Sequence, residues 1–205
     1  MEKLIPVQKI SAGTVAEIYY CPVAASPDLF PPEFSSGLPE KFCMRRKCEL
    51  LTIHYIISQT LGFSGKVHYD PDGKPFLPGY DKTISISHSA QYAAVLTAPA
   101  ACGVDVEKIS GRTEKVARKF LNEAERKVPE NTGRDLYYTL MWSVKETLFK
   151  ITGRPDYLRH MKTLVFPAPG KNFIEMSVDS GGKNKEFRVF YTTFDGHVLT
   201  WAYEG

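Results

Sequence analysis

The stretch RDLYYTLMWSVKETLFKITG, residues 134–153, decides much of the fold. Its apolar side chains recur at the three- and four-residue spacing of a single helix face: Leu136, Leu140, Val144, Leu148 and Ile151. A glycine at position 153 is typical of the residue that follows the last turn of a helix. The pattern therefore predicts a helix from about Arg134 to Thr152, with one face buried against a sheet.

Strand patterns lie on both sides of this helix. Upstream, residues 103–107 read GVDVE and alternate like a strand, and residues 84–97 read as two strands joined by a short turn. Downstream, three segments rich in β-branched and aromatic residues are separated by glycine-containing turns; they span residues 173–178, 187–193 and 197–203. The second half of the chain is therefore expected to contain a sheet and a long helix.

The first half has the same ingredients. Its first twenty residues look like strand material, and a loop dense in proline and serine follows over residues 22–39. Residues 41–61 have apolar side chains at helical spacing, and Gly62 follows as a plausible helix end. A turn composition, DPDGKP, occupies residues 70–75.

These elements predict an α+β fold of two similar lobes, a pseudo-dimer in which each lobe packs a long helix on a small antiparallel sheet. The segment APAA at 98–101 marks the junction, so we expect an N-terminal lobe of residues 1–101 and a C-terminal lobe of residues 102–205. The active site is expected in the cleft between the lobes. Asn122, with Glu125 three residues later, forms a capping-box pattern and predicts a further helix starting there.

Composition excludes several classes of protein. With 43% hydrophobic and 24% charged residues, the chain of 205 residues is neither mainly disordered nor fibrous. A net charge of +3 with mixed signs argues against a nucleic-acid binder, and no run of about 18 apolar residues predicts a membrane span. The start, MEKLIP, lacks a signal-peptide pattern, and the four cysteines lack metal-site spacing. We therefore expect a cytoplasmic protein with reduced thiols.

Three carboxylates are candidates for holding a metal ion. Asp105 and Glu107 lie two residues apart on a predicted strand, so both side chains face the same side. Oxygen ligands on a rigid element suit a hard cation such as Mg²⁺, although an isolated D-x-E pair is more often a solvated strand face. Glu146 lies on the long helix four residues before Lys150, a spacing that also fits a surface salt bridge.

A second group of residues could bind phosphate. Lys74 lies in GKP, residues 73–75, and Ser87 and His88 lie in SHS, residues 87–89, which closes a predicted strand. Ammonium, hydroxyl and imidazole groups can all donate hydrogen bonds to phosphate oxygens. Neither serine lies in a G-x-S-x-G elbow, and the chain contains no Walker A or dinucleotide-binding glycine pattern.

Taken in order, GKP, SHS, GVDVE, F-L-x-x-x-E and W-S-x-K-E-x-x-x-K resemble the motifs of the 4′-phosphopantetheinyl transferase superfamily. The single-chain, two-lobed type that activates surfactin synthetase is the most similar, and the resemblance runs from about residue 46 to residue 153. It implies Mg²⁺-dependent transfer, with Mn²⁺ as a substitute, of the 4′-phosphopantetheine arm of coenzyme A to a serine of an apo acyl, peptidyl or lysine-pathway carrier protein. Adenosine 3′,5′-bisphosphate is the other product.

The resemblance also implies roles for individual residues. The metal ligands would be Asp105, Glu107 and Glu146. The groups that contact coenzyme A would be Lys74, Ser87, His88, Lys150, Arg46 and His54. The catalytic residues would be Glu146, Glu107 and Lys150; the proton acceptor could be Glu146, Glu107 or a water molecule at the metal. His54 stands where the family has an arginine, unless the alignment is shifted there; Arg46 is a nearby replacement cation.

Two other functions stay open at this point. A catalytically degenerate homologue would bind coenzyme A or a carrier protein without transfer, and a metal-dependent phosphohydrolase on an unrelated fold would use the carboxylates alone. A basic segment after the GVDVE strand is either a docking surface for an acidic carrier or a solvated helix face; it contains Arg112, Lys115, Arg118 and Lys119. We expect a monomer, because two lobes in one chain complete the cleft, and no nucleic-acid or membrane partner.

Overall fold

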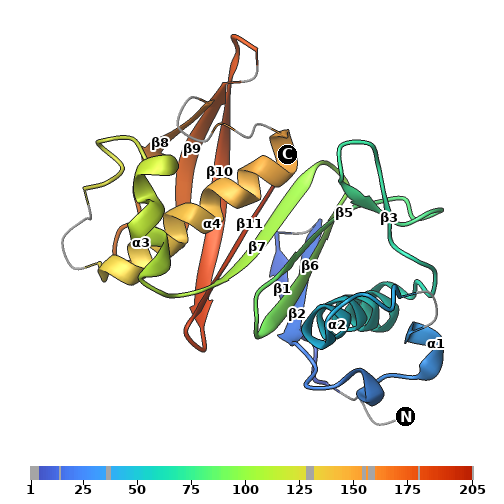
Figure 1. The fold of residues 1–205 in the computed structure, drawn as a ribbon. Coiled ribbons are helices and arrows are strands. Elements are labelled where there is room, and N and C mark those ends of the chain that lie inside the picture. The colour runs from blue at the N-terminus through green and yellow to red at the C-terminus, as the bar shows by residue number, and fades with distance from the viewer. Residues whose placement is uncertain are drawn as a thin grey trace. The chain divides into compact units, whose positions relative to one another are not determined.

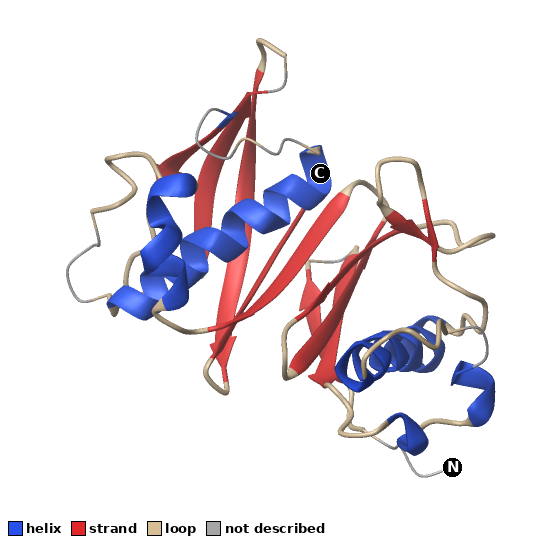
Figure 2. Cartoon of the chain, in the orientation of Figure 1, coloured by secondary structure: helices blue, strands red, loops and turns tan. Residues whose placement is uncertain are grey.

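The computed structural model describes residues 5–13, 15–35, 38–127, 132–153, 156, 160–179 and 181–204. The chain forms two compact units, Met1–Ala100 and Ala101–Gly205. Each unit combines a long helix with antiparallel strands, so the fold is α+β, as predicted (Figure 1, Figure 2). Within the part of the chain that is described, no helix is long and apolar enough to cross a membrane.

The first unit is a four-stranded antiparallel sheet with helix α2 (Met44–Leu61) against it. The strand order is β1-β2-β6-β5, and the strands are β1 (Gln8–Ala12), β2 (Ala16–Pro22), β5 (Thr83–His88) and β6 (Tyr92–Ala98). The strand material expected in the first twenty residues is a hairpin, in which Gln8 pairs with Tyr20. Two short helices precede α2: η1 (Pro27–Leu29) and α1 (Pro32–Ser35). Two short strands follow it and pair with each other: β3 (His68–Tyr69) and β4 (Pro75–Phe76).

Helix α2 confirms the predicted helix, with a start three residues later than expected. Cys43 has extended backbone angles and precedes the first turn, and Gly62 ends the helix in the left-handed region at φ 65°. One side of α2 packs against β2 and β6 and buries Leu51, Ile56 and Ile57. This apolar contact forms the core of the first unit and leaves the start of α2 at the border of that core.

The turn expected at residues 70–75 joins β3 to β4. The carboxylate of Asp70 accepts backbone hydrogen bonds from Asp72 (3.0 Å) and Lys74 (2.8 Å). Gly73 adopts φ 79°, a conformation that a residue with a Cβ reaches only at a cost. Lys74 therefore sits in a turn whose backbone is fixed by a side chain and a glycine.

The second unit is a five-stranded antiparallel sheet with helix α4 (Arg134–Thr152) against it. The strand order is β7-β11-β10-β9-β8, so both its strand number and its order differ from those of the first sheet. The strands are β7 (Cys102–Lys108), β8 (Met161–Val165), β9 (Phe173–Asp179), β10 (Asn184–Phe194) and β11 (His197–Tyr203). The three predicted C-terminal strands are confirmed as β9, β10 and β11; β8 was not expected.

Helix α4 has the predicted bounds and packs on β7 and β11. It ends at Gly153, which adopts φ 66° and donates its backbone N–H to the carbonyl of Phe149. The closest approach to the sheet is at Gly103: a Cβ there would lie 2.2 Å from the carbonyl oxygen of Thr147. Glycine at position 103 is therefore required for α4 to lie this close to β7.

The helix expected to start at Asn122 is a wrong prediction. Both capping-box bonds do form: Glu125 donates its N–H to Asn122 Oδ1 (2.9 Å), and Asn122 donates its N–H to Glu125 Oε2 (3.0 Å). However, residues 123–126 make only a turn. The carboxylate of Glu125 is buried and binds the side chain of Lys145, so this segment is held by the core of the unit instead of extending into a helix. Short elements α3 (Arg112–Val116) and η2 (Ala117–Lys119) precede it.

Candidate active site

Asp105 lies in the middle of β7 and is almost fully buried. Its Oδ2 accepts a hydrogen bond from Ser143 Oγ (2.8 Å), and its Oδ1 accepts one from Lys150 Nζ (3.0 Å). Lys150 Nζ also donates to the carbonyl of Val104 (2.7 Å). Lys150, whose i,i+4 spacing from Glu146 also fitted a surface salt bridge, thus bonds from the helix to the strand.

A row of hydroxyls continues from Asp105 into the interface between α4 and β11. Ser143 Oγ lies 2.8 Å from Thr200 Oγ1, which in turn lies 2.6 Å from Thr147 Oγ1. Thr200 is the register partner of Asp105 across β7 and β11. All of these hydroxyls are buried, so the hydrogen bonds compensate for the loss of water around them.

Glu107 lies two residues further along β7 and is partly buried. Its Oε1 accepts a hydrogen bond from Trp142 Nε1 (3.0 Å). Burial raises the pKa of Glu107 to about 7, and the charges of Asp105 and Glu146 act in the same direction, while the Trp142 bond and Lys150 oppose the shift. The three predicted metal ligands therefore act electrostatically on one another within the second unit.

The fit of a metal ion can be tested on these carboxylates. Asp105 and Glu107 share a strand, and Glu146 adds its charge from α4, which is the oxygen-rich, mutually repelling donor set that a hard divalent cation stabilises. Across the described ranges, no three His, Cys, Asp or Glu side chains are gathered closely enough to hold an ion. The donor chemistry thus fits Mg²⁺, while an ammonium group, that of Lys150, lies against Asp105.

Lys145, the lysine of the W-S-x-K-E motif, has a structural environment that the sequence did not reveal. Its side chain is 0% exposed and that of Glu125 is 1% exposed, and Nζ lies 2.8 Å from Glu125 Oε2 and 2.7 Å from the carbonyl oxygen of Phe120. Glu125 Oε1 also accepts bonds from the N–H and the hydroxyl of Thr163. This buried ion pair joins α4 to the 120–127 segment and to β8. Neighbouring Trp142 packs edge-on against Phe120.

In the first unit, the structure brings together two of the predicted coenzyme A contacts. Arg46, on α2, and His88, at the end of β5, lie 2.6 Å apart between a guanidinium nitrogen and Nε2. A third residue, which sequence reasoning left without a role, joins them: Glu49 accepts hydrogen bonds from Arg45 Nε (3.0 Å) and Arg46 (3.2 Å). Ser87 is buried next to His88 on β5.

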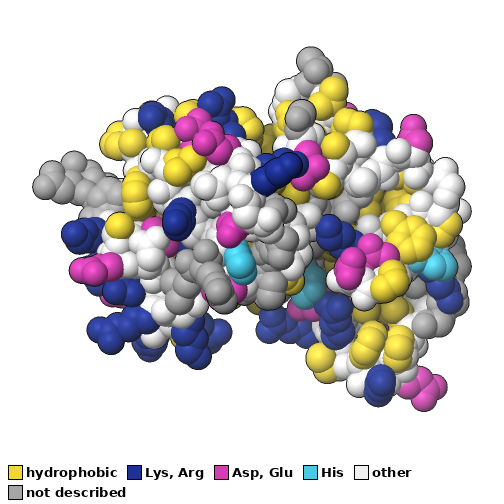
Figure 3. Space-filling view, turned by 90° about the horizontal axis from the view of Figure 1, so that it is seen from above, with side chains coloured by type: hydrophobic (Ala, Val, Ile, Leu, Met, Phe, Trp, Pro, Cys, Tyr) yellow, Lys and Arg dark blue, Asp and Glu magenta, His cyan; other side chains and the backbone are white. Residues whose placement is uncertain are grey.

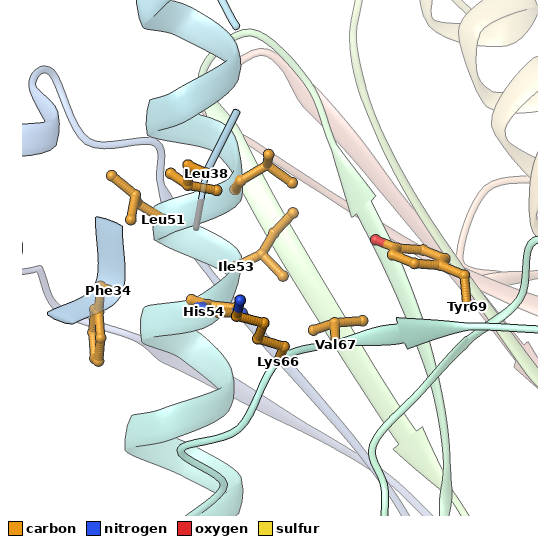
Figure 4. A pocket seen from close by; sticks show the side chains of 9 residues that line it. Phe34, Leu38, Leu51, Ile53, His54, Lys66, Val67 and Tyr69 are labelled. Atoms are coloured by element: carbon orange, nitrogen blue, oxygen red, sulfur yellow. The ribbon is translucent and has the colours of Figure 1, made fainter. Parts of the chain in front are cut away.

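The other predicted contact of the first unit, His54, lies in an apolar cavity of about 150 Å³ (Figure 4). The cavity is formed by α2, the segment before it and the segment leading into β3, and is lined by Phe34, Leu38, Leu50, Leu51, Ile53, His54, Lys66, Val67 and Tyr69. Phe34 meets the imidazole edge-on. Burial and the nearby charge of Lys66 lower the pKa of His54, so the uncharged ring is favoured. In that form His54 offers hydrogen bonds, but no charge, to a ligand.

Charged side chains are mixed over the surface. On the face that Figure 3 shows, Lys and Arg side chains occur in several groups with acidic side chains among them. The four cations of the predicted docking segment are all exposed, on α3 and η2: Arg112, Lys115, Arg118 and Lys119. Their exposure fits either of the two interpretations of this segment.

Comparison with known proteins identifies the second unit. A model of the 4′-phosphopantetheinyl transferase superfamily matches residues 101–202, which include β7, α4 and the acidic and hydroxyl residues around them. The match covers just under half of the chain, and over these residues the second unit is similar to that superfamily.

Two curated relatives of the superfamily show the extent of the similarity. The 4′-phosphopantetheinyl transferase gsp of Aneurinibacillus migulanus is 30% identical over 90 residues, which are 42% of this chain and 37% of that protein. A 4′-phosphopantetheinyl transferase of Bacillus subtilis is 32% identical over 88 residues, 40% of this chain and 38% of the relative. The matched part of the chain thus spans less than two fifths of the length of either relative.

The structure shows which residues the side chains of the helix motif contact. In W-S-x-K-E-x-x-x-K, the tryptophan binds Glu107, the serine binds Asp105, the first lysine is buried, and the last lysine binds Asp105. Sequence reasoning missed the roles of three residues: Glu49, Glu125 as an ion-pair partner, and Thr200. Glu125 is the glutamate of F-L-x-x-x-E, and its position three residues after Asn122 was interpreted as a helix cap.

Proposed function

We propose that this protein is a 4′-phosphopantetheinyl transferase, which moves the phosphopantetheine arm of coenzyme A to a serine hydroxyl of an apo carrier protein. The observation that supports this most strongly is the set of contacts between β7 and α4. Asp105 accepts from Ser143 and Lys150, and Glu107 accepts from Trp142. The two acids of the strand motif are thus held by side chains of the helix motif.

In the proposed reaction, the carrier serine oxygen forms a bond to the β-phosphorus of coenzyme A, and the bond from that phosphorus to the bridging oxygen breaks. Adenosine 3′,5′-bisphosphate leaves with the bridging oxygen. The serine proton passes to a base, for which Glu107 and Glu146 are the proposed groups.

Asp105, Glu107 and Glu146 would hold Mg²⁺, with Mn²⁺ as a substitute. The bound ion would neutralise charge that develops on the phosphates during the transfer. Lys150 is proposed as a further cation for a coenzyme A phosphate. Its ammonium group lies 3.0 Å from Asp105 Oδ1, close to the acids.

The remaining contacts to coenzyme A are assigned to the first unit. Lys74, Ser87, His88, Arg46 and His54 are the proposed groups. A positive group in a fixed turn, as in Lys74, and a guanidinium beside an imidazole, as in Arg46 with His88, both suit phosphate oxygens.

Transfer to a panel of apo carrier proteins tests this function. The protein is incubated with coenzyme A, Mg²⁺ and acyl, peptidyl and lysine-pathway carriers, and intact mass spectrometry should show the mass of the arm on the carrier serine. The Asp105→Ala variant is the negative control, and a proven transferase is the positive control. If the proven transferase labels the panel and this protein does not, the proposed activity is wrong. Tight coenzyme A binding without release of adenosine 3′,5′-bisphosphate would point to a degenerate, binding-only homologue.

The carrier is proposed to dock on the exposed basic segment of α3 and η2. Carrier proteins that are acidic around the modified serine would be attracted to Arg112, Lys115, Arg118 and Lys119, and such attraction raises the association rate in a salt-dependent way. Charge reversal at Arg112 and Lys115 should slow association without changing single-turnover chemistry. The proposal also includes a monomer in the cytoplasm, which sedimentation and cell fractionation test.

A further inference from the structure

Glu49 is a buried carboxylate surrounded by cationic side chains. The residue is 5% exposed and lies in the second turn of α2. Its Oε1 accepts from Arg45 Nε (3.0 Å), and its Oε2 accepts from Arg46 (3.2 Å) and lies 3.4 Å from His88 Nδ1. A carboxylate buried this deeply is stable only when such partners compensate for the lost water.

The contact between Arg46 and His88 fixes the protonation of the imidazole. A guanidinium can only donate hydrogen bonds, so at 2.6 Å His88 Nε2 must be the acceptor and cannot bear a proton. The proton of the neutral ring is then on Nδ1, the nitrogen that faces Glu49 Oε2. Glu49 therefore stabilises one tautomer of His88 and at the same time holds the guanidinium against the ring.

The exposed fractions show which groups a ligand can reach. The Glu49 side chain is 7% exposed, whereas those of Arg46 and His88 are 39% and 31% exposed. The carboxylate thus lies beneath the guanidinium of Arg46 and the imidazole of His88, which are both partly exposed. A phosphate that approaches from solvent meets Arg46 and His88 first and need not displace Glu49.

We propose that Glu49 is a positioning residue, which together with His88 holds the Arg46 guanidinium in place as an anion site for a phosphate group of coenzyme A. The inference rests on the proposed function for the identity of the ligand. The opposite role would be that of a placeholder, a carboxylate that occupies the phosphate position and must be expelled. The two roles predict opposite changes in affinity when the charge of Glu49 is removed.

The test uses the full-length protein and adenosine 3′,5′-bisphosphate as the probe. Nuclear magnetic resonance of ¹⁵N-labelled histidine reports which ring nitrogen of His88 bears the proton, and calorimetry gives the dissociation constant of the probe. The variants are Glu49→Ala, which removes both acceptor oxygens, and Glu49→Gln, which keeps one. Glu40→Gln, at an exposed position shortly before α2, is the control for loss of one negative charge.

For a positioning residue, Glu49→Ala should weaken probe binding by about tenfold or more, Glu49→Gln should fall between it and the wild type, and Glu40→Gln should bind like the wild type. The Nδ1–H tautomer of His88 should be lost in Glu49→Ala. Equal or tighter binding by Glu49→Gln would overturn the inference, as would an unchanged tautomer in Glu49→Ala.

If Glu49→Ala fails to fold, the Glu49→Gln affinity still decides between the two roles. A wild type that binds the probe but transfers no arm would contradict the proposed function and leave the positioning role standing.

Discussion

Lys150 Nζ lies 3.0 Å from Asp105 Oδ1, so the last residue of the helix motif and the first acid of the strand motif form a direct ion pair. The pair connects α4 to β7, and the Asp105 side chain is 6% exposed while that of Lys150 is 24% exposed. It places a positive charge where the proposed function requires Asp105 to meet a metal ion. Replacing Asp105 and measuring folding and activity separately therefore tests whether this carboxylate has a structural or a catalytic role.

Asp105→Asn should reduce transfer to the carrier by at least about a hundredfold, because it removes a charge that the reaction needs and keeps the side-chain volume. Steady-state kinetics with a responsive carrier measure the loss. Circular dichroism should show a folded protein, since Asn can still accept from Ser143. Glu186→Gln, at an exposed position on β10, removes the same charge and should keep wild-type turnover. Equal losses in both variants would contradict a specific role for Asp105.

Glu107→Gln should stabilise the metal-free protein in a pH-dependent way. Because the pKa of Glu107 is raised to about 7 in the folded state, ionising it is less favourable there than in the unfolded chain. The resulting destabilisation of the folded protein is absent below about pH 4, grows as the pH rises toward 7, and reaches its full size above pH 7. With Gln this destabilisation disappears, so unfolding at pH 8 in the presence of a chelator should require about 3 kcal/mol more free energy.

At pH 4 the unfolding midpoints of Glu107→Gln and the wild type should coincide. Glu186→Gln should show no comparable difference between the two pH values. A stabilisation of the same size at pH 4 and pH 8 would mean that the charge of Glu107 is not its cause.

The buried pair of Lys145 and Glu125 should respond unequally to the loss of either partner. Glu125→Gln leaves an ammonium group in a fully buried position and should cost about 3–5 kcal/mol of unfolding free energy. Lys145→Met should cost less, because the carboxylate left behind keeps the donors of Thr163 and the Asn122 N–H. Denaturant unfolding of both variants measures the order, and the reverse order would contradict it.

Gly103→Ala should strongly destabilise the second unit. The added Cβ would lie 2.2 Å from the Thr147 carbonyl oxygen, a backbone atom that cannot move unless α4 moves. Overpacking of this kind costs typically about 1–3 kcal/mol or more. Gly133→Ala is the matched control, because a Cβ there meets no atom within 4 Å and the backbone is not in the left-handed region. Thermal unfolding should therefore show a much lower midpoint for Gly103→Ala than for Gly133→Ala.

Lys74→Ala should raise the KM for coenzyme A with little change in kcat, because Lys74 is proposed to bind a phosphate in the ground state as well as in the transition state. Lys41→Ala removes the same charge at an exposed position and should leave KM unchanged. A fall in kcat at constant KM would instead place Lys74 among the groups that act on the transition state.

The sequence predicted the regular elements well where a strong period coincided with a clear end signal. Helix α4 has the predicted bounds because both signals are local: the apolar side chains lie on one face of the helix, and Gly153 ends it directly after Thr152. The Asn122 prediction failed for the opposite reason. Its capping-box bonds are local and do form, but the fate of the segment depends on Lys145, twenty residues further along the chain.

In the candidate site, too, the sequence predicted what depends on local pattern and missed what depends on contacts between distant residues. Sequence motifs identified the acids and cations, yet not that Lys145 and Glu49 are buried, because charged residues in a helix normally face water. Their burial is imposed by other elements: β8 supplies Thr163 beside Glu125, and β5 supplies His88 beside Glu49. The partner of each charge, and hence its role, follows from tertiary packing.

The hydroxyls behind Asp105 connect the candidate site to the packing of α4 on β11. Ser143 Oγ donates to Asp105 Oδ2 and lies 2.8 Å from Thr200 Oγ1, while the Thr200 hydroxyl also reaches the carbonyl oxygen of Ser143 (3.1 Å). The Thr147 hydroxyl lies 2.6 Å from Thr200 Oγ1 and 3.5 Å from the Thr200 carbonyl oxygen. Each threonine hydroxyl therefore binds both a side chain and the backbone of the neighbouring element, and a shift of α4 along β11 would disturb the serine that holds Asp105. The orientation of this carboxylate thus depends on residues as distant as Thr147, which no ligand needs to touch.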